Sequence, residues 1–129
     1  IVAWQKARIL THRIYGCSKV GSFARDFGLR DQVQRASVSS MANIAEGFER
    51  GGDKEFIQFL STAKGSCGEV KSHLYVAMDQ SYVSEEQFKA LYQQADEVSR
   101  LVAGFMGYLH QANVRGHKFK RPNEDDFRP

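Results

Sequence analysis

Proline is almost absent from this sequence of 129 residues, which contains only Pro122 and Pro129. Proline breaks a helix wherever it occurs in the helix interior, because it lacks the backbone N–H and clashes with the preceding turn. Both prolines come after the last stretch that shows a regular apolar pattern. Everything before residue 122 is therefore free to be helical.

Cysteine is equally scarce, and Cys17 and Cys67 show no Cys-x-x-Cys spacing. This pattern indicates neither a disulfide framework nor a zinc site, and it fits a reducing cytoplasm. Long apolar runs are missing too: none approaches the ~20 residues that a membrane-spanning helix needs. Residues 1–7 lack the apolar stretch of a signal peptide. We therefore expect a cytoplasmic protein that does not enter a membrane.

The composition is that of one ordinary globular domain. Apolar residues make up 42% of the chain, and its length suffices for one core but not for two. Eighteen Lys and Arg against fifteen Asp and Glu give a net charge of +3, with a pI near 9.0. This mild excess permits a polyanionic partner without requiring one.

Apolar residues recur at spacings of three and four in four segments, which is the period of an amphipathic helix. The spacing predicts helices over about 3–17, 29–50, 53–77 and 84–113. Residues 18–28 form a connection that holds one short helical turn. No segment shows the alternating pattern of a β-strand, so the sequence predicts an all-α protein.

Two helix boundaries carry their own signals. Gly51 and Gly52 end the second helix, because glycine takes the left-handed conformation that follows a helix C-terminus at no steric cost. Ser84 and Gln87 have the spacing of a capping box at the start of the fourth helix. Val83 and Phe88, across the same turn, are placed to form a hydrophobic staple.

Short connections make consecutive helices antiparallel, so we expect an up-down four-helix bundle over residues 1–113. Residues 114–129 form a basic and then acidic tail, which we expect to be flexible. Val38, Met41 and Ala45 form a second apolar stripe on the second helix, beside the stripe that faces the core. This second stripe suggests burial on more than one face.

Four glycines interrupt the interiors of the third and fourth helices, where each costs about 1 kcal/mol relative to alanine. They are Gly65, Gly68, Gly104 and Gly107. Close helix–helix contact inside the chain is the simpler explanation. The alternative is a flat strip of Gly65, Ser66 and Gly68 on which another subunit docks, and the second apolar stripe favours this reading slightly.

Several stretches form a pattern that is more specific than any single motif. They include Trp-Gln-Lys-Ala at 4–7, Arg-Ala-Ser-Val-Ser at 35–39, Asn-Ile-Ala-Glu-Gly-Phe at 43–48 and Lys-Glu-Phe-Ile-Gln-Phe-Leu at 54–60. In this order they resemble the four-helix-bundle proteins encoded in 23S ribosomal RNA intervening sequences. The resemblance implies a cytoplasmic bacterial bundle that forms a ring-like homopentamer and has a poorly defined biochemical role.

The accessory variability protein of diversity-generating retroelements is similar to this family in architecture. That protein is a basic pentamer that looks like a partner of reverse transcriptase and nucleic acid, but an analogy of fold does not establish an activity. The chain departs from the family pattern twice. Met41 replaces a proline, so we expect a straighter second helix. Ser22 replaces another proline and can cap with its hydroxyl.

Asn43 and Glu46 lie one turn apart among apolar neighbours, and we expect both to be partly buried. Buried polar groups need partners. The favoured interpretation is a hydrogen-bonded pair, joined by an arginine on another helix such as Arg35 or Arg50, that fixes helix register or a subunit contact. A catalytic carboxylate is the less favoured interpretation.

No arrangement of catalytic or metal-binding residues stands out. A di-iron bundle needs Glu-x-x-His motifs, and no glutamate here has a histidine three positions later; Glu69 and His73 are four apart. There is no glycine-framed nucleophile and no phosphate-binding loop. We expect Cys17 and Cys67 to be packing residues. The sequence therefore predicts no catalytic site, no metal, no cofactor and no small-molecule substrate.

Basic residues are the remaining functional signal. Lys6 and Arg13 share a face of the first helix, and Lys64 and Lys71 share a face of the third. Residues 1–64 hold ten Lys and Arg against six Asp and Glu. Repetition around a ring would multiply these modest patches into a strong positive field.

The tail adds Lys118, Lys120 and Arg121 around Phe119, a pattern suited to phosphates and base stacking. Acidic residues at 124–126 follow at once, so a solubilising tail is an equally good interpretation.

Two hypotheses account for these patterns. In the first, a non-enzymatic oligomeric bundle binds RNA or a ribonucleoprotein partner through Lys6, Arg13, Lys64, Lys71 and the tail. In the second, the protein is a scaffold whose apolar helix faces recruit another polypeptide, and nucleic acid has no role.

Overall fold

The computed structural model describes residues 1–114, which form five helices. These are α1 (Val2–Ser18), α2 (Gly21–Arg25), α3 (Phe27–Glu49), α4 (Asp53–Asp79) and α5 (Glu85–Val114). No strand occurs among the described residues, and the predicted all-α class is confirmed. The bounds of the four long helices agree with the prediction to within two residues, and α2 is the expected short turn.

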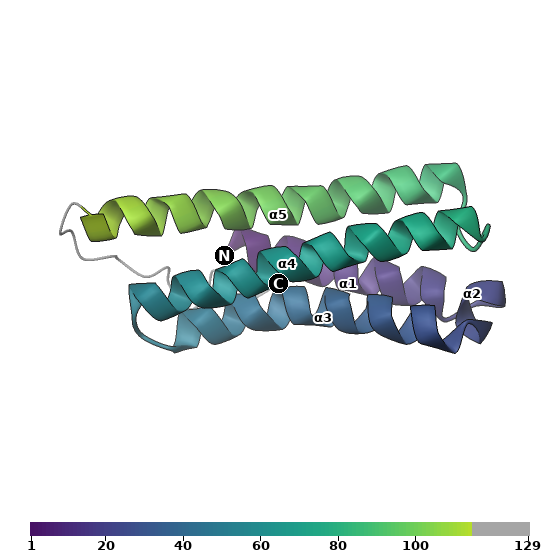
Figure 1. Cartoon of the computed structure of the whole chain (residues 1–129), viewed down its shortest axis with the longest axis horizontal. Coiled ribbons are helices and arrows are strands. Elements are labelled where there is room, and N and C mark those ends of the chain that lie inside the picture. The colour runs from purple at the N-terminus through teal and green to yellow at the C-terminus, as the bar shows by residue number, and fades with distance from the viewer. Residues whose placement is uncertain (115–129) are drawn as a thin grey trace.

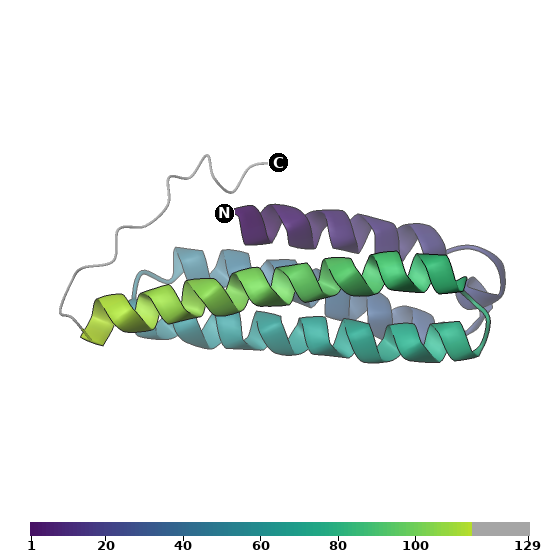
Figure 2. The same ribbon diagram turned by 90° about the horizontal axis from the view of Figure 1, so that it is seen from above.

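The four long helices lie side by side and alternate in direction (Figure 1). Both α1 and α4 contact α3 on one side and α5 on the other, which closes a bundle around one core. The view from above shows that α1 begins well short of the end at which α3 turns into α4 (Figure 2). The opposite end holds α2 and the turn between α4 and α5 (Figure 1).

The core consists of the apolar stripes that predicted the helices. Its largest fully buried side chains include Leu10, Ile14, Val33, Ile44, Phe56, Leu60, Leu74, Val98 and Val102. Their spacing of three and four residues places one side of each long helix toward the bundle axis. None of the described helices combines the length and the apolar character that crossing a bilayer would take.

The boundary signals at Gly51 and Ser84 are confirmed. Gly51 follows α3 with a φ of +94°, a conformation that only glycine adopts without strain. At α5, the Ser84 N–H donates to Gln87 Oε1 at 2.8 Å, and the Gln87 N–H donates to Ser84 Oγ at 3.0 Å. Val83 and Phe88 are both buried across this turn, as a hydrophobic staple requires.

The expectation that Ser22 caps a helix is wrong. Ser22 lies inside α2, and its hydroxyl accepts a hydrogen bond from Arg25. Asp26 caps α3 instead, because its Oδ1 accepts the Leu29 N–H at 3.2 Å. Its other oxygen, Oδ2, accepts the Tyr82 hydroxyl at 2.9 Å. This bond ties the turn between α4 and α5 to the start of α3, and it is the largest cause of the raised pKa of Tyr82.

The glycines inside α4 and α5 are not sites of close contact within the chain. A Cβ added at Gly65, Gly68, Gly104 or Gly107 would meet no atom within 4 Å. The close approach lies at Gly47 in α3, where a Cβ would be 2.9 Å from Phe59 Cβ and 3.0 Å from Phe56 Cδ1. The simpler explanation given above for the four glycines is therefore wrong, and Gly47 is the residue that brings α3 and α4 together.

Candidate functional site

A small polar seam joins α3 to α4 and consists of Ser39, Asn43 and Ser66. Asn43 Nδ2 donates to the Ser39 carbonyl oxygen at 2.9 Å and to Ser39 Oγ at 3.0 Å. Ser66 Oγ, from α4, donates to the same Ser39 Oγ at 2.9 Å. Two of the predicted residues thus meet through Ser39, which the sequence did not single out because serine is common in this stretch.

The predicted pair of Asn43 and Glu46 does not form. The Glu46 side chain is 50% exposed, and it makes an ion pair with Arg50 at 3.0 Å, one turn further along the chain. Each residue of the predicted pair bonds to a residue one turn away in the other direction, Asn43 to Ser39 and Glu46 to Arg50. Arg50 does contact Glu46, but it lies four residues along the same chain segment rather than on another helix, so this contact fixes no helix register.

Ser66 is not part of an exposed strip with Gly65 and Gly68. It is buried against α3, whereas the two glycines face outward from α4. Ser61, Gly65, Gly68 and Ser72 are the exposed residues that form a small-residue strip along this face. On α3, the second apolar stripe is partly exposed, with Val38 at 40% and Met41 and Ala45 at intermediate exposure.

Two of the predicted basic residues are held by acids of α5. Lys71 Nζ, from α4, lies 2.7 Å from Asp96 Oδ1 and 5.3 Å from the centroid of the Tyr92 ring. Lys6 Nζ, from α1, lies 3.5 Å from Glu97 Oε1. The hydrogen bond from Lys71 is the main cause that lowers the pKa of Asp96. Helix α5 therefore lies between the two predicted basic pairs, which do not form one continuous face.

The other two predicted basic residues, Arg13 and Lys64, are exposed. Within the described part of the chain, no carboxylate lies within ion-pair distance of either side chain. The same holds for Arg8 and Lys19, which are also exposed. A signal for this surface was present in the sequence, since residues 1–25 contain no Asp or Glu at all. Helix α1 is thus a basic helix without a single acid.

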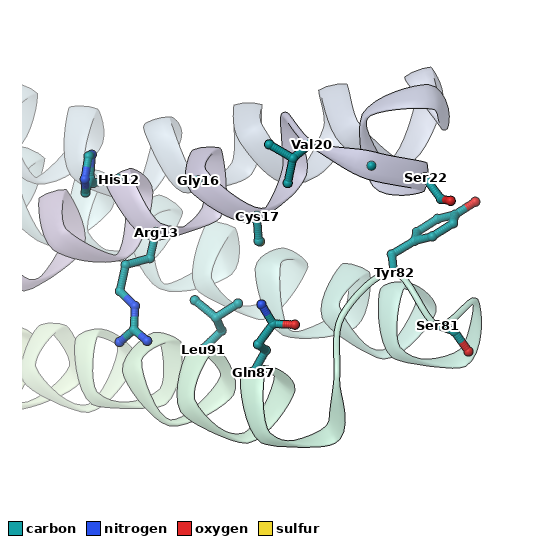
Figure 3. Close-up of a pocket in the computed structure, with 11 residues that line it drawn as sticks. His12, Arg13, Gly16, Cys17, Val20, Ser22, Ser81, Tyr82, Gln87 and Leu91 are labelled. Atoms are coloured by element: carbon teal, nitrogen blue, oxygen red, sulfur yellow. The ribbon is translucent and has the colours of Figure 1, made fainter.

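An open cleft of about 540 Å³ lies where α1 ends and α5 begins (Figure 3). Its walls come from α1, from the start of α2, from the turn between α4 and α5, and from the first turns of α5. Its lining includes Arg13, Cys17, Tyr82, Gln87 and Leu91. Arg13 is the one predicted basic residue that lines this cleft.

The two cysteines occupy different environments. Cys67 is fully buried in the core, and burial raises the pKa of its thiol to about 11. Cys17 is only partly buried and lines the cleft, although burial also raises its pKa. The predicted packing role is confirmed for Cys67, whereas Cys17 lies at the margin of the core.

The tail residues Lys118, Lys120 and Arg121 lie outside the described residues. Among residues 1–114, no group of three or more His, Cys, Asp and Glu side chains is placed to hold a metal ion.

Comparison with known proteins gives one family and one fold. Residues 1–104 match the family described as 23S rRNA-intervening sequence protein. A crystal structure of a protein of unknown function from the S23 ribosomal protein family of Bacteroides thetaiotaomicron is similar, with a TM-score of 0.76 and 21% sequence identity. The match covers 82% of this chain and 96% of that chain, and at this identity it shows the fold alone. No curated protein matches the chain significantly.

Proposed function

The chain belongs to the family of 23S rRNA-intervening sequence proteins, and on this basis we propose that it is a cytoplasmic, non-enzymatic homo-oligomer that binds RNA or a ribonucleoprotein partner through its basic surface. One observation carries the proposal. Arg8 and Arg13 of α1 and Lys19, which directly follows this helix, are exposed, and no carboxylate occurs between residues 1 and 25. Cations that lack an acidic partner can neutralise phosphates without first breaking an ion pair.

The predicted basic residues contribute unequally to this surface. Arg13 and Lys64 have no acidic partner among the described residues and can bind a phosphate directly. Lys6 and Lys71 each form an ion pair, so a phosphate of the RNA has to replace the carboxylate. Lys118, Lys120 and Arg121 extend the basic surface beyond the described residues. Because these cations are spread over α1, α4 and the tail, RNA contacts one protomer at several separate points, and several copies bind more tightly than one.

We further propose that copies associate through α3 and α4, in the ring-like homopentamer that the family resemblance implies. The small-residue strip of α4 (Ser61, Gly65, Gly68 and Ser72) allows another helix to approach closely. The α3 apolar stripe (Val38, Met41 and Ala45) offers side chains that fill such a surface. A contact between two different faces is heterologous, and repetition with a suitable rotation closes a ring.

The assembly is tested by light scattering of nuclease-treated protein. We expect a mass close to five times the 14.6 kDa of one chain. Gly65→Leu places a bulky side chain on the small-residue strip and should reduce the mass to that of one chain. Gly104→Leu is the matched control, because it also fills an open glycine position in a helix and should leave the mass unchanged. A wild-type protein that remains monomeric at high concentration would contradict the assembly.

RNA binding is tested by fluorescence anisotropy with a short labelled single-stranded RNA at increasing salt. The three contacts of Arg8, Arg13 and Lys19 alone should lower the affinity roughly twentyfold between about 50 and about 200 mM salt. Changing these three residues to glutamine should remove that share of the salt dependence.

The matched control changes Arg50, Lys89 and Arg100 to glutamine, because all three are exposed and pair with an acid on their own helix. It alters the net charge equally and should leave RNA binding nearly intact. If binding is indifferent to salt, the electrostatic mechanism is wrong, and the protein scaffold becomes the better hypothesis.

A further inference from the structure

The cleft at the α2 end of the bundle collects groups that are remote in sequence. Arg13 extends from α1 toward α5, Gln87 and Leu91 extend from α5 toward α1, and Cys17 points into the space between them (Figure 3). Tyr82, on the turn between α4 and α5, borders the far end. A volume of about 540 Å³ lies within the range of small-molecule sites in proteins.

Arg13 and Gln87 are donors in the cleft lining that lack a protein acceptor, and the lining contains no acidic group. Arg13 makes no ion pair with a described carboxylate, unlike Lys6 on the same flank of α1. Gln87 Oε1 is already occupied by the Ser84 N–H of the capping box. Its amide nitrogen is therefore left to donate, and it is turned toward α1 (Figure 3). A guanidinium and an amide N–H₂ in the lining of one cleft favour a ligand that carries an anionic acceptor such as phosphate.

The remaining wall of the cleft is apolar. Leu91 is almost fully buried and forms the floor beside Cys17, and Val20 lies at the rim with 57% of its surface exposed. The Tyr82 ring stacks on Phe23 at 5.4 Å and donates its hydroxyl to Asp26, so it is held in place. A flat apolar group can rest against this wall while an attached anion reaches Arg13.

We propose that this cleft binds one nucleotide unit, with the phosphate at Arg13, the base against Leu91 and Val20, and the Gln87 amide donating to another part of the same unit. The inference rests on the proposed function and deepens it, because the unit can belong to a bound RNA as well as to a free nucleotide. In a bound RNA, the cleft would then bind one nucleotide while the exposed cations of α1 bind the phosphates of its neighbours.

Cys17 provides a built-in reporter for the test. It lines the cleft and is partly exposed, whereas Cys67 is fully buried, so a neutral alkylating reagent such as N-ethylmaleimide should modify only Cys17 in the folded protein. Peptide mass spectrometry identifies the modified cysteine. The reaction is followed under mildly alkaline conditions, because burial raises the pKa of the Cys17 thiol and the thiolate is the reactive form.

We expect AMP to slow the alkylation of Cys17 in a saturable manner, by fivefold or more at saturation, and adenosine without phosphate to protect much less. Arg13→Gln should weaken the protection by AMP about tenfold or more, since it removes a charged hydrogen bond. Arg35→Gln is the matched control, because it removes an exposed arginine of α3 outside the cleft lining and should leave the protection unchanged.

Three results would overturn the inference: no saturable protection by AMP or by a short RNA, equal protection in the Arg13→Gln variant, or inorganic phosphate protecting as well as AMP. The anisotropy experiment separates this failure from that of the proposed function. Salt-dependent RNA binding with an unprotected Cys17 would leave the proposed function standing without the cleft. Protection by AMP in a protein that binds no RNA would support the cleft as a site for free nucleotides.

Discussion

Phe56→Ala is expected to lower the free energy of unfolding by about 3–5 kcal/mol, the cost of removing a large ring from a packed core. Phe56 is fully buried in α4, and its ring centroid lies 5.3 Å from that of Phe105 in α5 and 6.4 Å from that of Phe48 in α3. The ring thus joins three helices at the end of the bundle that α1 does not reach (Figure 2). Because each neighbour is fixed on its own helix, the cavity cannot close without moving a helix.

The matched control for this variant is Phe27→Ala. Phe27 is 64% exposed, and its described contact is with the Arg30 guanidinium, 4.8 Å from the ring centroid. Its loss should cost no more than about 1 kcal/mol. Urea unfolding followed by circular dichroism measures the free energy of unfolding of both variants. All samples must have the same protein concentration, because assembly of subunits adds to the apparent stability. Equal losses for the two phenylalanines would contradict the buried position of Phe56.

Gly47→Leu should lower the free energy of unfolding by about 3 kcal/mol, at the upper end of the cost of overpacking. The first added atom already falls 2.9 Å from Phe59 Cβ, an atom attached directly to the α4 backbone that cannot rotate away. The rest of the leucine would have to enter the same space. The variant therefore forces α3 and α4 apart, and the roughly 1 kcal/mol gained in helix propensity does not compensate.

Gly104→Leu, the same substitution at another glycine, should instead raise the free energy of unfolding. A Cβ at Gly104 meets nothing within 4 Å, so the gain of up to about 1 kcal/mol in helix propensity should appear undiminished. Thermal unfolding of the two variants measures the contrast. If Gly47→Leu were as stable as Gly104→Leu, the close approach of α3 and α4 would be wrong.

The helices were predictable because their information is local. The spacing of apolar residues shows which side of each helix faces the core, and Gly51, Ser84 and Gln87 mark ends through contacts within one turn. The distance between two helices is different, because it depends on side chains of both. In the sequence, Gly47 looks like one more helical glycine beside Gly65, and only the packing of α3 on α4 distinguishes them.

The same distinction between features within one helix and contacts between helices applies to the candidate sites. The sequence showed that Lys6 and Lys71 lie on helix faces, but not that Glu97 and Asp96 of α5 would reach them. The partner of Asn43 is a serine, a residue type that carries no distinctive pattern. The cleft could not be found in the sequence because Arg13 and Gln87 line a common space only once α1 and α5 are packed. In contrast, the acid-free stretch of residues 1–25 could be found by inspection.

Adjacent carboxylates on α5 extend to opposite neighbours, Asp96 to Lys71 of α4 and Glu97 to Lys6 of α1. One residue along a helix is a shift of about 1.5 Å and a rotation of about 100°. A one-residue slip of α5 would therefore carry both acids away from both lysines at once. The same slip would turn Val98 and Val102 out of the core, so the two partly exposed ion pairs reinforce a register that the apolar seam of α5 already sets.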